Sequence, residues 1–374
     1  MVKMSDIFKR KDESGEGKRP ESKEEPKPIP SIFKKPPEKE PAADTKIEPP
    51  KISCAKPAPI DLTNIMQKKA EIVPLPSVES QEACNEVYKK CIDALNRAIE
   101  QIKKGKAISI DELLAALDLI RVHLEAEKDN LIELAYYNEG EDYLRNHLVN
   151  VLIFSLIIGE RIGYSKDHFL QLGLTSLIYD LGMVNFLDLA QLPRKLNAEE
   201  LERIHGHVNK SVEILQSSGY NDKDDQIKKA ILEHHERIDG SGYPSGLKGS
   251  EINELARIIG VVDTFEALTH KRAWRPRMLA FDAIKAMLDK KSLYDPKILK
   301  MLIDGVTIYP TGSLVLLNTE DVGKVVKLQL SAPLRPVVQI LKDGQGNVCE
   351  ETKVIDLMKN PTLFIKKPLE KQDN

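Results

Sequence analysis

The sequence predicts a mainly α-helical protein, in which an all-helical domain is preceded by a disordered tail and followed by a small β domain. Three observations support this prediction. Residues 1–76 hold 13 of the 22 prolines among many lysines and glutamates. From Ser77 to about Ser292, apolar residues recur three and four positions apart, as in amphipathic helices. After Pro310, short runs rich in valine and leucine alternate with turn residues, as in strands.

The tail, residues 1–76, is too polar to bury the apolar surface that would offset the entropy cost of ordering. Two short peptides within it are similar, Ile7-Phe8-Lys9 and Ile32-Phe33-Lys34. They would suit docking of one protein partner, or they are a chance recurrence in a segment of biased composition. The sequence leaves both readings open.

Residues 77–140 are predicted to form a helical hairpin. The first helix covers about 80 to 104 and ends at Gly105. The second begins with a capping-box pattern, in which Ser109 accepts from backbone N–H groups and Glu112 reaches back.

Residues 141–309 are predicted to form a second helical region, and residues 310–374 a small β-barrel or sheet. The helices are expected at about 141 to 162, 166 to 181, 198 to 216, 223 to 236, 251 to 270 and 277 to 290. The strands are expected at 313–317, 322–330 and 337–341, with a hairpin turn at 343–346.

The composition predicts a soluble cytoplasmic protein. A net charge of −3 gives no electrostatic case for bulk DNA or RNA binding, so any nucleotide must be held by a local site. The four cysteines lack CxxC spacing, which fits a reducing compartment. The most apolar stretch, Leu148 to Gly159, is well short of the ~20 residues of a membrane span.

Histidines and aspartates at wide intervals form a candidate metal site in the second helical region. Imidazole and carboxylate together suit Fe, Mn, Zn or Ni, and a bridging carboxylate holds two ions close together. Sites with two such ions cleave phosphodiesters by activating water. The candidate ligands are His147, Asp180, His207, His234, His235 and Asp263.

The most specific segment runs from His234 to Pro244, with the sequence His-His-Glu-Arg-Ile-Asp-Gly-Ser-Gly-Tyr-Pro. Adjacent histidines end a helix, and Gly240 and Gly242 then allow a close backbone approach to a ligand. This string resembles the signature of the HD-GYP family, a branch of the HD phosphohydrolase superfamily, in both order and spacing.

The resemblance covers roughly residues 85 to 310. It implies an all-helical fold with a di-iron or dimanganese centre that hydrolyses the messenger cyclic di-GMP to the linear dinucleotide and GMP. It also implies that the six candidate ligands bind metal, with Asp180 and Asp263 as the catalytic carboxylates. The family's phosphate-binding basic positions fall on Arg272 and Arg275, and the GYP tyrosine on Tyr243.

Two positions depart from the family pattern. The chain has Tyr179 where the family has the histidine of the HD pair, and Met183 where it has a lysine. A phenol with an ordinary pKa of about 10 is a poor ligand for divalent ions at neutral pH. Met183 removes a positive charge that would meet a phosphate oxygen. Tyr143 stands where some members have an extra carboxylate ligand, so no third ion is expected.

Three functions are compatible with this sequence. The first is a phosphodiesterase, of full or weakened activity, acting on cyclic di-GMP or a related cyclic dinucleotide with one or two divalent ions. Fe or Mn is favoured, with Zn or Ni as alternatives. The second is an inactive receiver that binds the nucleotide and signals to a protein partner through the tail or the β segment. The third is a protein-interaction scaffold, and oligomerisation is open in each case. Four other histidines are expected on helix surfaces, namely His123, His168, His205 and His270.

Overall fold

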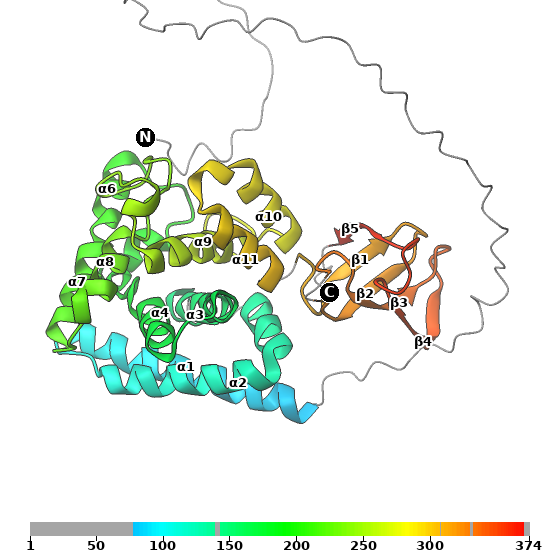
Figure 1. The fold of residues 1–374 in the computed structure, drawn as a ribbon, viewed down its shortest axis with the longest axis horizontal. Coiled ribbons are helices and arrows are strands. Elements are labelled where there is room, and N and C mark those ends of the chain that lie inside the picture. The colour runs from blue at the N-terminus through cyan, green and yellow to red at the C-terminus, as the bar shows by residue number, and fades with distance from the viewer. Residues whose placement is uncertain (1–77, 139–142, 307, 330–331, 370–374) are drawn as a thin grey trace, which may run out of the picture. The chain divides into compact units, whose positions relative to one another are not determined.

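The computed structural model describes residues 78–138, 143–306, 308–329 and 332–369 (Figure 1). A helical domain is followed by five strands, which confirms the predicted fold class. The tail and its two similar peptides lie outside the described residues.

One helix, α3, forms the centre of the helical domain (Figure 1). Every residue of α3 from Leu148 to Gly159 is buried, because α2, α4, α9 and α11 pack around it. The α-helices are α1 (Val78–Lys103), α2 (Ile110–Tyr137), α3 (Tyr143–Ile162), α4 (Lys166–Ile178), α5 (Leu187–Ala190), α6 (Ala198–His205), α7 (His207–Ser217), α8 (Gln226–Glu233), α9 (Glu254–Thr269), α10 (Ala280–Asp289) and α11 (Pro296–Val306).

The helices α1 and α2 pack together as the predicted hairpin. The Ser109 side chain accepts from the backbone N–H of Glu112, as expected. The Glu112 carboxylate, however, accepts from Arg97 Nε at 2.5 Å instead of reaching back to the cap. The expected capping box is therefore wrong in its second half, because a charged partner on α1 lies within reach.

Three helical predictions need correction. The helix predicted to 181 ends at Ile178, and a 3₁₀ helix follows at Leu181–Phe186. The helix predicted over 198–216 is two helices, with Gly206 between α6 and α7. Helix α11 was not predicted, although Pro296 is its first residue and Asp295 accepts from the N–H of Lys297, both of which are start signals.

One segment, Lys166–Ala190, is long and apolar enough to cross a membrane by composition alone, with a mean hydropathy of 1.2. Its most apolar part is 67% buried inside the protein. It is also divided between α4, a 3₁₀ helix and α5. We therefore interpret it as part of the helical core.

The β domain is a five-stranded antiparallel sheet with the strand order β4-β3-β2-β1-β5. Its strands are β1 (Leu314–Leu317), β2 (Val322–Lys327), β3 (Val337–Lys342), β4 (Val348–Asp356) and β5 (Ile365–Leu369). The predicted turn at 343–346 joins β3 to β4, and Asp343 stabilises it by accepting from the N–H groups of Gln345 and Asn347. Strands β4 and β5 were not predicted.

Candidate metal centre

The six predicted metal ligands come from five separate elements and meet in two adjacent clusters. His207, His234 and His235 form one cluster, and His147, Asp180 and Asp263 form the other. Within each cluster, one possible ligand atom per residue lies within 4.8 Å of the others. The fold therefore brings together the side chains that were chosen as candidate ligands from the sequence.

Two glycines allow the supporting elements to approach this closely. A Cβ on Gly182, just after Asp180, would lie 2.1 Å from the backbone oxygen of His207. A Cβ on Gly260, in α9, would lie 2.6 Å from the backbone oxygen of His234. Contacts this short with backbone atoms exclude any side chain, so both glycines are required for the observed packing.

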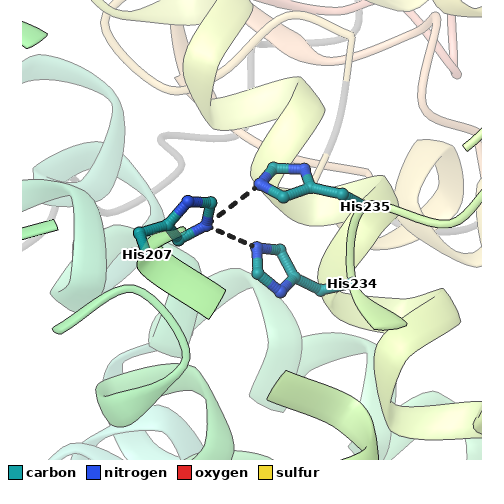
Figure 2. Close-up of side chains that lie close together, drawn as sticks. All are labelled: His207, His234 and His235. Atoms are coloured by element: carbon teal, nitrogen blue, oxygen red, sulfur yellow. Dashed lines mark hydrogen bonds between the residues drawn. The ribbon is translucent and has the colours of Figure 1, made fainter. Parts of the chain in front are cut away.

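The imidazoles of the first cluster point at one another (Figure 2). His207 Nε2 lies 3.4 Å from His234 Nε2 and 3.2 Å from His235 Nε2. The Nδ1 atoms of His207 and His234 donate to backbone carbonyl oxygens, each at 2.7 Å. In the neutral form, the Nε2 atoms of these two rings are therefore lone-pair acceptors that face each other.

This cluster fits a metal ion. Two ligand atoms about 2.1 Å from an ion lie about 3.0 Å apart at a right angle and about 3.4 Å apart at the tetrahedral angle. The separations around His207 Nε2 match these values. Burial, and to a lesser extent the charge of the neighbouring His207, lowers the pKa of His234 to about 4. Burial also lowers the pKa of His235. Both rings are thus neutral donors of electron pairs at pH 7.

Asp180 lies between the two clusters. Its Oδ1 is 3.0 Å from His207 Nε2, and its Oδ2 is 3.7 Å from His147 Nε2. Burial alone would raise the pKa of Asp180, but the charge of His207 lowers it to about 2. Apart from this ion pair with His207, Asp180 Oδ1 has no hydrogen-bond partner among the residues that the structure describes. A buried carboxylate needs positive charge nearby, and a metal ion would supply it here, so this position between the clusters is the one expected for a bridging ligand.

In the second cluster a hydroxyl group contacts two of the ligand atoms. His147 Nε2 and Asp263 Oδ1 are 3.1 Å apart. The Tyr179 hydroxyl donates to Asp263 Oδ1 at 2.9 Å and lies 2.6 Å from His147 Nε2. Burial and then the charge of Asp263 raise the pKa of Tyr179 well above its ordinary value. Tyr179 is thus a neutral phenol that is part of the site.

Glu266 supports His147 and was not predicted. Its carboxylate is buried and contacts His147 Nδ1 at 2.5 Å and Asn150 Nδ2 at 3.1 Å. His270 adds a third contact at 3.2 Å. The prediction that His270 lies on a helix surface is wrong, because the ring is buried and lies 2.8 Å from the Ala135 carbonyl oxygen. Glu266 follows Asp263 by one turn of the apolar α9, and a carboxylate on such a helix is a signal in the sequence, because a buried charge needs a partner.

The two arginines expected to bind phosphate contact protein groups in this structure. Arg272 Nη2 donates to Glu266 at 2.7 Å, and the guanidinium lies over the Tyr143 ring at 4.3 Å from its centroid. Arg275 donates to the carbonyl oxygens of Ala267 and Leu268 near the end of α9. Their role in phosphate binding stays a prediction.

The glycine-rich loop after the paired histidines is held by Glu236. The Glu236 carboxylate, 5% exposed, accepts from the backbone N–H groups of Ser245, Gly246 and Leu247. A Cβ on Gly242 would lie 2.4 Å from Glu236 Cα, so Gly242 allows the loop to fold back on Glu236. Gly240 has a φ of +84°, which a side chain rarely adopts.

We expect Glu236→Gln to lower the free energy of unfolding by about 1–3 kcal/mol, because the amide leaves a backbone N–H unsatisfied. Denaturant unfolding of the two full-length chains would measure this. Glu202→Gln is the control, since the Glu202 side chain is 82% exposed. Equal stabilities of the two variants would contradict a supporting role for Glu236.

Tyr243 stacks between two histidines. Its ring centroid lies 3.8 Å from that of His205 and 4.7 Å from that of His235, with interplanar angles of 22° and 24°. Burial and then the charge of Asp180 raise the pKa of Tyr243 well above its ordinary value. The tyrosine of the motif therefore lies directly beside the histidine cluster. Its predicted contact with substrate is not tested.

Comparison with known proteins identifies both structured parts of the chain. Residues 142–298 match the family described as "HD domain", and residues 314–374 match "KOW domain associated with HD domain". The solved structure titled "Bd1817, a HDG"Y"P protein from Bdellovibrio bacteriovorus" is similar with a TM-score of 0.50 and 16% identity, covering 61% of this chain and 72% of that one. At this identity the similarity concerns the fold alone.

Curated relatives match more than half of the chain. "Cyclic di-GMP phosphodiesterase PA4108" of Pseudomonas aeruginosa is 27% identical over 68% of this chain and 61% of its own length. "Cyclic di-GMP phosphodiesterase response regulator RpfG" of Xanthomonas campestris pv. campestris is 30% identical, over 59% and 58%. "3'3'-cGAMP-specific phosphodiesterase 3" of Vibrio cholerae is 25% identical, over 59% and 50%. The chain therefore spans about three fifths or less of the length of these relatives.

The helical domain is an HD domain, a class whose clustered histidines and aspartates bind divalent metal. In its paired histidines, its Gly-Tyr-Pro string and its relatives it is similar to the HD-GYP branch, with Tyr179 in place of the histidine of the HD pair.

Proposed function

We propose that this chain is a metal-dependent phosphodiesterase that hydrolyses cyclic di-GMP to the linear dinucleotide and GMP. The observation that carries the proposal is the set of facing imidazole nitrogens beside a buried Asp180 oxygen that has no hydrogen-bond partner among the described residues. Such a set binds a cation whose Lewis acidity activates water and a phosphodiester. The names of the relatives support the substrate class, and those with 3'3'-cGAMP in their names make this related dinucleotide the first alternative substrate.

The residues of the chain have distinct roles in this proposal. His207, His234 and His235 hold the metal, and Asp180 turns one oxygen toward each cluster. The loop held by Glu236 lies beside them and supplies a close backbone approach for the nucleotide. Arg272 and Arg275 remain proposed phosphate contacts. To bind phosphate, each must give up the hydrogen bonds that it now makes to protein groups.

The proposal also specifies the identity of the metal, the cellular location and the partners. Mixed imidazole and carboxylate ligands favour Fe or Mn, with Zn or Ni as alternatives. We propose a cytoplasmic location, because a cyclic dinucleotide messenger is the substrate. A protein partner that contacts the tail or the β domain is a further proposal, which no observation on the described residues tests.

A second candidate function is a receiver that binds the nucleotide without cleaving it. The hydrogen bonds of the Tyr179 hydroxyl to the two ligands His147 and Asp263 favour this candidate. Met183, 6% exposed, also supplies no charge where the family has a lysine. Both changes weaken chemistry more than binding, since the His207 cluster is left intact.

Product analysis distinguishes the two functions. The full chain, purified without air and loaded with Fe²⁺ or Mn²⁺, is incubated with cyclic di-GMP or 3'3'-cGAMP, and products are followed by chromatography. We expect cleavage that stops when a chelator removes the metal. Nucleotide binding by calorimetry without any product would instead establish the receiver.

A further inference from the structure

The two halves of the metal centre differ in what contacts their ligand atoms. In one half, the Tyr179 hydroxyl is hydrogen-bonded to His147 Nε2 at 2.6 Å and to Asp263 Oδ1 at 2.9 Å. The phenol ring is fully buried and packs edge-on against His234, with centroids 4.8 Å apart. Tyr179 is therefore held firmly in the position that the family fills with the histidine of the HD pair, a metal ligand.

The separation of Tyr179 Oη and His147 Nε2 is that of a hydrogen bond rather than of two ligands on one ion. Two ligand atoms about 2.1 Å from an ion lie at least about 3.0 Å apart when they subtend a right angle or more. Because the Tyr179 hydroxyl donates its one proton to Asp263 Oδ1, the proton between the two atoms at 2.6 Å is that of His147 Nε2. That proton lies along the direction in which Nε2 would bind a metal.

The carboxylates on this side also have partners already. Asp263 accepts from Tyr179, and Glu266 is paired with both His147 and Arg272. In the other half, Asp180 Oδ1 forms no hydrogen bond among the described residues, its ion-pair partner His207 Nε2 lies 3.0 Å away, and His234 Nε2 and His235 Nε2 converge on that same His207 nitrogen. The carboxylate that a metal ion would stabilise most is therefore Asp180, beside His207.

We propose that the Tyr179 hydroxyl takes the place of one metal ion, so that the chain holds a single divalent ion at His207, His234, His235 and Asp180. This inference rests on the proposed metal-dependent function and specifies its metal centre. A Tyr–His–Asp hydrogen-bond group then keeps His147 and Asp263 in position. Tyr179 is in this sense a residue that determines the metal content of the site.

Metal counting in four versions of the full chain tests the proposal. Each protein is stripped, reloaded with Mn²⁺ under anaerobic conditions, desalted and analysed by mass spectrometry for metal per chain. We expect one ion in the unaltered chain, one in His147→Gln, none in His207→Gln and two in Tyr179→His. The two glutamine variants are a matched pair, and circular dichroism checks that both are folded.

Electron paramagnetic resonance gives a readout that is independent of activity. We expect the hyperfine pattern of an isolated Mn²⁺ in the unaltered chain and that of a spin-coupled pair in Tyr179→His. Two ions in the unaltered chain, with one lost in His147→Gln, would overturn the inference and leave the proposed function standing. A visible charge-transfer band after loading with Fe³⁺ would also overturn it, because Tyr179 would then be a ligand. No metal in any version would overturn both.

Discussion

Asp180→Asn is expected to reduce the hydrolysis of cyclic di-GMP by at least about 10²-fold, because even residues that only orient metal ligands cost 10–100-fold when changed. Asp180 does more than orient. Its Oδ1 is 3.0 Å from His207 Nε2, and an amide offers a weaker ligand without the negative charge. We therefore expect the loss in kcat to be accompanied by a loss of bound metal. Steady-state kinetics with saturating Mn²⁺, together with the metal content after desalting, would measure both.

Asp167→Asn is the matched control for this prediction. Asp167 is an exposed aspartate in the first turn of α4, the helix that leads to Asp180. The control removes one carboxylate charge from an exposed position on the helix that precedes Asp180, and it should leave kcat and metal content unchanged. Full activity in Asp180→Asn would contradict the assignment of Asp180 to the metal centre.

Much of the fold could be predicted because local sequence signals decide it. The periodic apolar residues of α1 and α3 face the core, and the Asp343 turn forms where the turn residues predict it. What could not be predicted depends on contacts between elements. Glu112 leaves its cap because Arg97 is close by on the neighbouring helix. No local pattern places those two side chains together.

In the candidate metal centre, too, local sequence predicted some residues, and contacts between elements decided the others. The histidine motif is contiguous, so its members could be selected from the sequence, and Asp180 and Asp263 followed from the resemblance. Tyr179 was recognised as an altered position, but its hydrogen bonds to His147 and Asp263 depend on how α3, α4 and α9 pack. Glu266 was missed for a related reason, since its partners His147 and Arg272 are 119 and 6 positions away.

Tyr179→His is expected to raise kcat/KM for cyclic di-GMP by about tenfold or more, within the 10–100-fold range that groups around a metal control. The change removes the hydroxyl that is hydrogen-bonded to both His147 Nε2 and Asp263 Oδ1. It also adds an imidazole that suits divalent metal better than a phenol does. A second ion next to Asp180 would then stabilise charge that develops on the phosphate and the leaving oxygen. Initial rates at limiting substrate, measured with equal Mn²⁺ loading, would give the ratio.

Tyr179→Phe separates the two parts of this effect. It removes the same hydroxyl and keeps the ring that packs against His234, but it supplies no ligand. We therefore expect no rise in kcat/KM for Tyr179→Phe. An equal rise in both variants would mean that the hydroxyl alone inhibits the reaction. A Tyr179→His chain that binds two ions but shows no gain in rate would mean that metal content does not limit hydrolysis. The receiver function would then be favoured, because the uncharged Met183 and the protein contacts of Arg272 would still hinder catalysis.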